Sequence, residues 1–323
     1  MVHKPSWFTD GRVFVSYAPT VGINKDGAEL YVIDSATGTR TDRIDDKLQE
    51  DVETLVSGGT TDTSSWVDYD NLTDRLVAVP AYFDKRPLSE FDELMSLPGM
   101  SEFGSATLGE LISDGRLTYS TGHGSPSADF RTGHIPYIKV SDIRAGQLNI
   151  NPTNRVPRVV AERFWRGESS QLNAYDLLSP IRTSKNIGDF AVLMPGQEQV
   201  VLTKEILVLR ATHLANFDTF YLLWALTLKA VRRQWSRIVF MQTNREDVGA
   251  RFKEIRLPIP PSRQVGEEYS RAFREYYLGT QELRDRFLTY LAIDNKHHVF
   301  MSTVSEQDLD GEDVLLSEEF DDE

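Results

Sequence analysis

The chain has 323 residues, of which 35 are Lys or Arg and 49 are Asp or Glu, so its formal net charge is −14. A hydrophobic content of 40% is enough to build packed cores and excludes a disordered polymer. The absence of cysteine excludes a disulfide framework and thiol catalysis, and it favours a cytoplasmic location. We expect no secretion signal at the amino terminus, and no apolar run reaches the roughly 20 residues of a membrane span.

The charge is divided unevenly along the chain. Residues 1–103 carry 9 basic and 19 acidic side chains, whereas residues 104–262 carry 20 basic and 14 acidic side chains, a net charge of +6. Residues 263–323 are again acidic, with 6 basic and 16 acidic side chains. A uniformly acidic protein would repel nucleic acid, but the basic middle segment is compatible with DNA phosphates as ligands.

The amino-terminal part predicts strands. Residues 12–18 and 28–34 alternate between apolar and polar side chains, as half-buried strands do. Between them, the run from Asn24 to Gly27 (Asn-Lys-Asp-Gly) has the composition of a turn. These elements therefore predict two strands joined by a loop with a tight turn.

A short helix is predicted next, over residues 42–56, followed by a polar run over residues 57–65 that has no periodicity and predicts a linker. We therefore expect a first segment over residues 1–60 and a linker or lead-in over residues 61–103. The apolar stripe of the helix consists of Ile44, Leu48, Val52 and Leu55.

Residues 104–262 mix helical and β-rich patterns, which predicts an α+β domain with a small twisted sheet and flanking helices. Leu108 to Ile112 predicts a helix, and Asn216 is a candidate N-cap for a longer helix that ends at Trp235. The run from Ile255 to Pro261 must be extended, because residues before proline avoid helix. The β-rich runs are residues 135–140, 200–203 and 206–210.

Residues 263–295 predict one long helix with a heptad pattern, a seam of apolar side chains spaced alternately by three and four residues. A lone helix cannot bury such a seam, so we expect it to pair with a helix of this chain or of another. Gly279 and Thr280 interrupt the middle of the pattern. The side chains expected to pair are Tyr269, Phe273, Tyr276, Leu283, Phe287 and Tyr290.

The last segment, residues 296–323, is predicted to be an acidic disordered tail. Residues 305–323 contain ten carboxylates and no Lys or Arg, so the segment repels itself and has few apolar anchors. Two interpretations stay open: a solubilising tail, or a phosphate mimic that covers the basic middle domain.

Motifs for catalysis are few. The only Pro-Pro pair, Pro260-Pro261, lacks the flanking residues of an adenine methylase clamp, and the six histidines do not have metal-ligand spacing. One pattern, Asp34 with Asp45 and Lys47, resembles the Asp…Asp-x-Lys arrangement of magnesium-dependent nucleases. A magnesium-dependent nuclease is therefore an alternative, against the interpretation of these residues as a solvated acidic loop.

The middle segment carries a more specific series of motifs. They are Phe103-Gly-Ser-Ala-Thr-Leu-Gly-Glu-Leu-Ile112, Gly133-His-Ile-Pro-Tyr-Ile-Lys-Val-Ser-Asp-Ile-Arg144, Asp176-Leu-Leu-Ser179, Arg182-Thr-Ser-Lys-Asn-Ile-Gly188 and Ile255-Arg-Leu-Pro-Ile-Pro-Pro261 entering a long helix. In this order they resemble a target recognition domain of the type I restriction-modification specificity (S) subunit, over about residues 104–293. Upstream, Val13-Phe-Val-Ser-Tyr-Ala18, Gly22, Leu30-Tyr31 and Asp45-Asp46 are similar to the carboxyl-terminal end of an N6-adenine DNA methyltransferase.

The resemblance implies a chain that reads double-stranded DNA without a catalytic site or a cofactor of its own. Arg, Asn and Gln suit contacts with base edges, and Lys and Arg neutralise phosphates. The implied DNA-binding residues are Lys139, Arg144, Arg182, Thr183, Ser184, Lys185, Asn186, Gln242, Thr243, Asn244 and Arg245.

The resemblance also implies partners. A full specificity subunit has two recognition domains and two long helices, and this chain has one of each, so we expect a homodimer or a second specificity chain joined through the long helix. A DNA methyltransferase subunit would bind S-adenosylmethionine, and a restriction subunit could join the complex. The alternative is an interaction or DNA-mimic protein of a defence complex, which keeps the fold without reading DNA.

Overall fold

The computed structural model describes residues 11–68, 79–126, 133–151, 153–182, 184–242 and 245–294, without the side chains of 241–246 and 291–294. These residues form two compact units. The first comprises the described residues of Met1–Leu97 and Ser236–Phe240, and the second comprises those of Pro98–Trp235 and Met241–Glu323. The predicted acidic tail, residues 296–323, lies outside the described residues.

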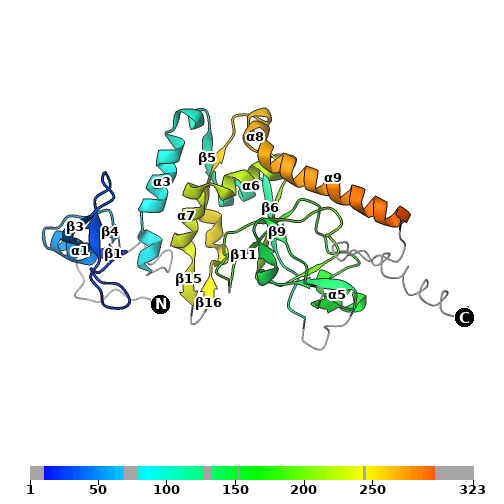
Figure 1. Ribbon diagram of the computed structural model, residues 1–323, viewed down its shortest axis with the longest axis horizontal. Helices are drawn as coiled ribbons and strands as arrows, with labels where there is room; N and C mark the ends of the chain where they lie inside the picture. The colour runs from blue at the N-terminus through cyan, green and yellow to red at the C-terminus, as the bar shows by residue number, and fades with distance from the viewer. Residues whose placement is uncertain are drawn as a thin grey trace, which may run out of the picture. The chain divides into compact units, whose positions relative to one another are not determined.

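The first unit is built from two antiparallel strand pairs and short helices (Figure 1). One pair joins β1 to β4, and the other joins β2 to β3. The elements are β1 (Arg12–Ser16), β2 (Tyr31–Ile33), β3 (Arg40–Ile44), α1 (Lys47–Val56), β4 (Ser64–Asp68), the 3-10 helix η1 (Pro80–Phe83) and α3 (Arg86–Met95).

The first unit extends further along the chain than its predicted end at residue 60. The polar run before Trp66 looked like a linker, but Ser64 and Ser65 are buried and belong to β4. Their strand pairs with β1, and the rings of Phe14 and Trp66 pack edge to face at 5.2 Å. The predicted linker over residues 61–103 thus contains β4, η1 and α3.

The second unit contains two sheets and two smaller strand pairs. The larger sheet has the order β6-β14-β11-β12-β9-β8, and the smaller has the order β10-β7-β13. The bounds are β6 (Leu117–Thr121), β7 (Ile135–Ile138), β8 (Ile143–Arg144), β9 (Gln147–Leu148), β10 (Arg155–Val156), β11 (Leu177–Pro180), β12 (Ala191–Val192), β13 (Val201–Leu202) and β14 (Ile206–Ala211). The smaller pairs are β5 (Gly104–Thr107) with β17 (Arg256–Ile259), and β15 (Phe240–Gln242) with β16 (Arg245–Asp247).

The main core of the second unit is apolar and draws on both sheets. Ile138 of the smaller sheet is fully buried in one cluster with Leu178 and Val208 of the larger sheet. A neighbouring cluster is centred on Trp165, whose indole Nε1 donates a hydrogen bond of 2.9 Å to the Val200 carbonyl. The predicted β-rich runs at 135–140, 200–203 and 206–210 thus form β7, β13 and β14 and supply this core.

Polar contacts of one histidine also join the two sheets. The Leu202 N–H donates to Nδ1 of His123 at 2.9 Å, so the other ring nitrogen, Nε2, donates to the Ser170 carbonyl at 2.9 Å. Burial lowers the pKa of His123, although the bond to Ser170 opposes the shift. The neutral imidazole is therefore the form that this position stabilises.

Helices α4, α6 and α8 of the second unit begin at side-chain caps. Thr107 and Glu110 form a capping box at α4, and Asp218 caps α6 by accepting from the Tyr221 N–H at 2.9 Å. Asn216, the predicted cap, instead donates to the Pro260 carbonyl. The helical elements are η2 (Pro98–Met100), α4 (Leu108–Ser113), η4 (Val140–Asp142), α5 (Arg158–Trp165), α6 (Thr219–Thr227), α7 (Lys229–Ile238), η5 (Gly249–Glu254), α8 (Arg263–Tyr269) and α9 (Arg271–Asp294).

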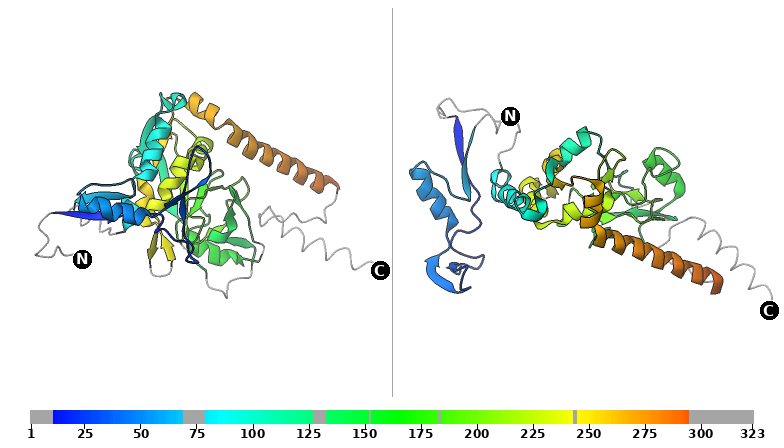
Figure 2. Two further views of the ribbon diagram at one scale, coloured as in Figure 1. Left: turned by 60° about the vertical axis from the view of Figure 1, so that its left-hand side comes forward. Right: turned by 90° about the horizontal axis from the view of Figure 1, so that it is seen from above.

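The long helix predicted over residues 263–295 is two helices, with Ser270 between α8 and α9. Figures 1 and 2 show α9 leaving α8 as a single straight helix. Its Tyr277 is buried against the second unit and donates to the Gly146 carbonyl at 2.7 Å, and burial raises its pKa to about 12. The fold is of the predicted mixed α+β class with a long carboxyl-terminal helix, and that helix packs on the preceding domain.

Within the described part of the chain, no helix has both the length and the apolar character needed to cross a membrane.

Candidate nucleic-acid interface

Two loops that are far apart in the sequence meet beside the end of β11. The loop after β11 and the β15–β16 hairpin are joined by a backbone hydrogen bond of 3.1 Å from the Val248 N–H to the Ile181 carbonyl. Arg182 and Asp247 form an isolated β-bridge, and Nε of Arg182 lies 2.8 Å from a carboxylate oxygen of Asp247. The structure therefore brings together the two segments that the sequence predicted to contact DNA.

The adjoining 3-10 helix η5 adds two cations that the sequence analysis did not single out. Arg251 donates to the Asp247 carbonyl at 2.7 Å, and the Lys253 ammonium lies 4.5 Å from the centre of the Tyr119 ring. Phe252 lies between them and is buried. The alternation of charged and apolar residues in this run is therefore the sequence pattern that could have identified the two cations. We call Arg182, Lys185, Arg251 and Lys253 the basic cluster.

The loop that carries Arg182 and Lys185 is anchored on α7. Arg232 donates to the Ile187 carbonyl at 2.5 Å and forms an ion pair of 2.8 Å with Asp189. Gly188 has a φ of +80°, and a Cβ there would lie 2.5 Å from the ring of Trp235. Only a glycine lets the backbone of the loop lie this close to Trp235 of α7, so Gly188 allows the loop to pack against the helix.

Within the loop, the exposed Lys185 is flanked by two half-buried polar residues. The Ser184 hydroxyl accepts a hydrogen bond of 3.1 Å from the Asn186 N–H, which shapes the turn. Thr183, Thr243 and Asn244 lie outside the described residues. For Gln242 and Arg245 the structure describes the backbone in β15 and β16, but not the side chain.

The remaining predicted DNA contacts, Lys139 and Arg144, lie on the β7–β8 segment. The Lys139 ammonium donates to the Asn154 side chain at 2.9 Å and lies 5.7 Å from the centre of the Tyr137 ring. Arg144 is exposed on the edge strand β8 and donates to the Ser141 carbonyl. These partners come from neither the loop nor the hairpin of the basic cluster.

The predicted pairing seam, which runs from the end of α8 along α9, divides into two parts. Its first part serves the second unit itself: the Tyr269 hydroxyl donates to the Gly99 carbonyl at 2.6 Å, and Phe273 and Tyr276 line a cavity of about 600 Å³. Its second part, with Leu283, Phe287 and Tyr290, is exposed. The buried face of α9 is an adjacent stripe, which includes Tyr277, Gln281, Arg284 and Leu288 as buried or half-buried residues.

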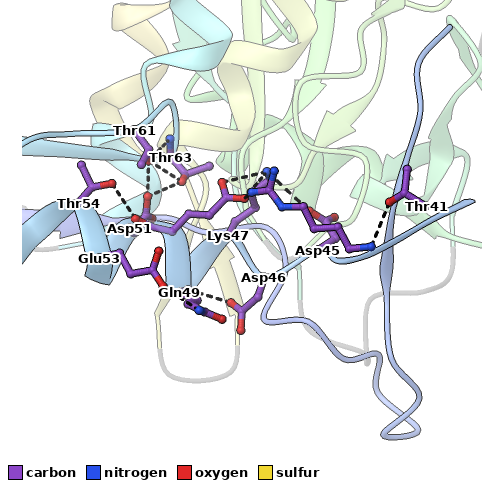
Figure 3. A network of polar contacts seen from close by, with 12 residues as sticks. Thr41, Asp45, Asp46, Lys47, Gln49, Asp51, Glu53, Thr54, Thr61 and Thr63 are labelled. Carbon is purple, nitrogen blue, oxygen red and sulfur yellow. Dashed lines mark hydrogen bonds and ion pairs between the residues drawn. The ribbon is translucent and has the colours of Figure 1, made fainter.

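The residues of the nuclease alternative, Asp34 on one side and Asp45 with Lys47 on the other, lie at opposite ends of the β2–β3 hairpin. Asp34 is in the turn of the β2–β3 hairpin, where its carboxylate accepts from the N–H groups of Thr37 and Ala36, and these bonds lower its pKa. Asp45 follows β3 at the other end of the hairpin, and its partner Lys47 also pairs with Glu50 (Figure 3). No cluster of three or more His, Asp or Glu that could hold a metal occurs among the residues that the structure describes.

Comparisons with known proteins give structural neighbours only, since no family model and no curated protein matches the chain. The S subunit of a type I restriction-modification system from M. genitalium is similar, with 12% identity and a TM-score of 0.36 over 60% of this chain and 46% of that one. So is the HsdS subunit from Thermoanaerobacter tengcongensis, with 14% identity and a TM-score of 0.34 over 80% of this chain and 61% of that one.

A third similar chain belongs to a structure of the complex assembly and conformational transition of the type I restriction-modification system. It has 15% identity and a TM-score of 0.38 over 76% of this chain and 54% of that one. The present chain thus spans between 46% and 61% of the length of these three. At such TM-scores the likeness carries no functional conclusion.

Proposed function

We propose that the chain is a non-catalytic DNA sequence-recognition subunit of a restriction-modification system or a related phage-defence methylation system. The observation that carries the proposal is the basic cluster, in which Arg182 pairs with Asp247 of the β15–β16 hairpin, Arg251 of η5 bonds to the same Asp247, and Lys185 lies on the Arg182 loop. The order of sequence motifs from Phe103 to Pro261 supports it independently.

The geometry suits readout of a duplex groove. A two-stranded ribbon fits the major groove, and the β15–β16 hairpin is such a ribbon. Gln242 is the last residue of β15 and Arg245 is the first residue of β16. Nε of Arg182 pairs with Asp247, and the N–H donors on its Nη atoms would contact a base edge or a phosphate. Lys185, Arg251 and Lys253 would neutralise nearby phosphates.

One recognition domain reads one half of a bipartite site, so the proposal includes pairing. The exposed Leu283, Phe287 and Tyr290 of α9 would join two copies of the chain, or this chain and a second specificity chain. A DNA methyltransferase subunit, with or without a restriction subunit, would complete the complex. S-adenosylmethionine would bind the methyltransferase.

The salt dependence of DNA binding tests the proposal. The full chain is titrated against a fluorescent random-sequence duplex at several salt concentrations, beside Arg182→Ala/Lys185→Ala and the control Arg263→Ala. Arg263 is an exposed arginine on α8, at the opposite end of the second unit from β16 (Figure 1). We expect the double variant to weaken binding and to lower the slope of log K against log salt by about 2, and the control to do neither.

The alternative, an interaction protein that does not read DNA, predicts the opposite result in this titration. A chain that only docks partner proteins would bind duplex DNA weakly or not at all, and the substitutions in the basic cluster would leave that result unchanged. Equal salt slopes for the wild type, the double variant and the control would therefore contradict DNA reading by this cluster.

A further inference from the structure

Helix α1 of the first unit turns its polar face inward. Asp51 is fully buried on that face, and its carboxylate accepts a hydrogen bond of 2.5 Å from the Ser16 hydroxyl. It also accepts from the hydroxyls of Thr63, at 2.7 Å, and Thr61 (Figure 3). These hydroxyls come from β1 and from the segment before β4, so one carboxylate ties the helix to two other parts of the unit.

The network stabilises the ionised carboxylate. Burial alone would raise the pKa of Asp51, but the hydroxyls of Ser16, Thr61, Thr63 and Ser64 together hold it below its ordinary value. If the helix turned about its axis, Asp51 would leave its site and these hydroxyls would lose their acceptor, so the network fixes which face of α1 is turned inward. The inward polar face is therefore a fixed property of the unit.

The consequence is that α1 exposes its apolar face. Leu48, Val52 and Leu55 are spaced by four and three residues and lie on one side of the helix, and they are 42%, 51% and 37% exposed. Val56 beside them is also exposed. We call these four residues the α1 stripe. An amphipathic helix ordinarily buries such a stripe, and an exposed contiguous one marks an interaction site.

The charges around the α1 stripe select the partner. Residues 11–68 contain 5 Lys or Arg and 11 Asp or Glu, and Arg43 and Lys47 are both paired with Glu50. The exposed Glu53 lies on α1 beside the stripe, and the unit around it carries an excess of acidic side chains. A second copy of this unit would oppose acid to acid, and DNA would be repelled, whereas a basic border on the partner would be attracted.

We propose that the α1 stripe docks another protein, whose apolar contact surface is bordered by Lys or Arg. This docking site is separate from the basic cluster, and it does not depend on DNA reading by the second unit. The chain would then bind DNA through one unit and a protein partner through the other.

Three labelled peptides test the proposal by fluorescence anisotropy with the full chain. They are an amphipathic Leu/Lys helix, a scrambled peptide of the same composition, and a Leu/Glu helix with the same apolar pattern. The variant is Leu48→Ser/Val52→Ser, and the matched control is Val159→Ser, an exposed apolar residue on α5 of the second unit.

We expect the wild type to bind the Leu/Lys helix at least about tenfold more tightly than either other peptide, and Leu48→Ser/Val52→Ser to abolish that preference. The Val159→Ser control should retain it. Equal binding of the Leu/Glu or scrambled peptide, or equal loss in the control, would overturn the proposal.

Two further outcomes would assign the stripe to another occupant and would also overturn the proposal. A dimer that Leu48→Ser/Val52→Ser converts to monomer, while the Leu/Lys preference is absent, would identify a second copy. A large fall in the unfolding midpoint of that variant would show that the chain covers its own stripe. DNA binding measured on the same variant should be unchanged, which separates this test from that of the proposed function.

Discussion

The exposed part of α9 permits a quantitative prediction for pairing of two copies. The perturbation is Leu283→Ser together with Phe287→Ser, on the side of α9 that faces away from the second unit's core. Full burial of a Leu or Phe side chain contributes ~1.5–3 kcal/mol. Burying the exposed 63% of Leu283 and 44% of Phe287 therefore contributes roughly 1.5–3 kcal/mol per helix.

A two-fold interface contains each residue twice, so the double substitution should weaken the dimer by about 3–6 kcal/mol, a rise of about 10²- to 10⁴-fold in the dissociation constant. Sedimentation velocity over a wide concentration range measures this constant. Leu278→Ser, an exposed apolar residue of α9 outside the seam, controls for the lower helix propensity of serine. An unchanged dissociation constant in the double variant, or a wild type that stays monomeric at tens of micromolar, would refute the reasoning.

Two further predictions concern buried titratable groups. Asp51→Ala should destabilise the first unit by about 2–4 kcal/mol, because the hydroxyls that bond to its carboxylate lose their acceptor. The control Asp62→Ala replaces an exposed carboxylate and should not destabilise the unit. Thermal unfolding followed by circular dichroism compares the two variants. The lowered pKa of Asp51 means that its contribution is present at neutral pH and is lost as the pH falls below about 3.9. The pKa of His123 is lowered by burial, so the free energy of unfolding should fall as the pH drops below about 6.5. His123→Asn should remove that part of the pH dependence, and an equally steep fall in the variant would contradict the assignment.

The sequence predicted the local structure of each segment better than it predicted which segments contact one another in the fold. Runs of β-branched residues located β7 and β14, and the prolines located the extended β17. The pairing of β1 with β4 across nearly fifty residues was not apparent, because strand partners are set by packing and not by the local pattern. Arg251 was missed because its link to the Arg182 loop runs through Asp247, and the bridge of Asp247 with Arg182 forms only in the folded chain.

Helix α1 shows a separate limit of sequence patterns. Its apolar periodicity predicted an amphipathic helix over residues 42–56, and the helix forms from Lys47, with Leu48, Val52 and Leu55 on one side and Ile44 in the preceding β3. Periodicity reports that a helix has two faces, but it does not report which face is buried. The buried Asp51 and its hydroxyl donors decide that question, and these donors are more than thirty residues away at Ser16 and about ten away at Thr61.

Selection of DNA sequences from a random duplex library by the full chain tests whether this protein reads a DNA sequence. The wild type and Arg263→Ala should enrich a common sequence motif, and Arg182→Ala/Lys185→Ala should not enrich it. If α9 joins two copies, the motif should occur twice at a fixed spacing. Duplexes that emerge without any shared motif, or a motif that the double variant enriches equally well, would contradict the claim that this chain reads DNA through the basic cluster.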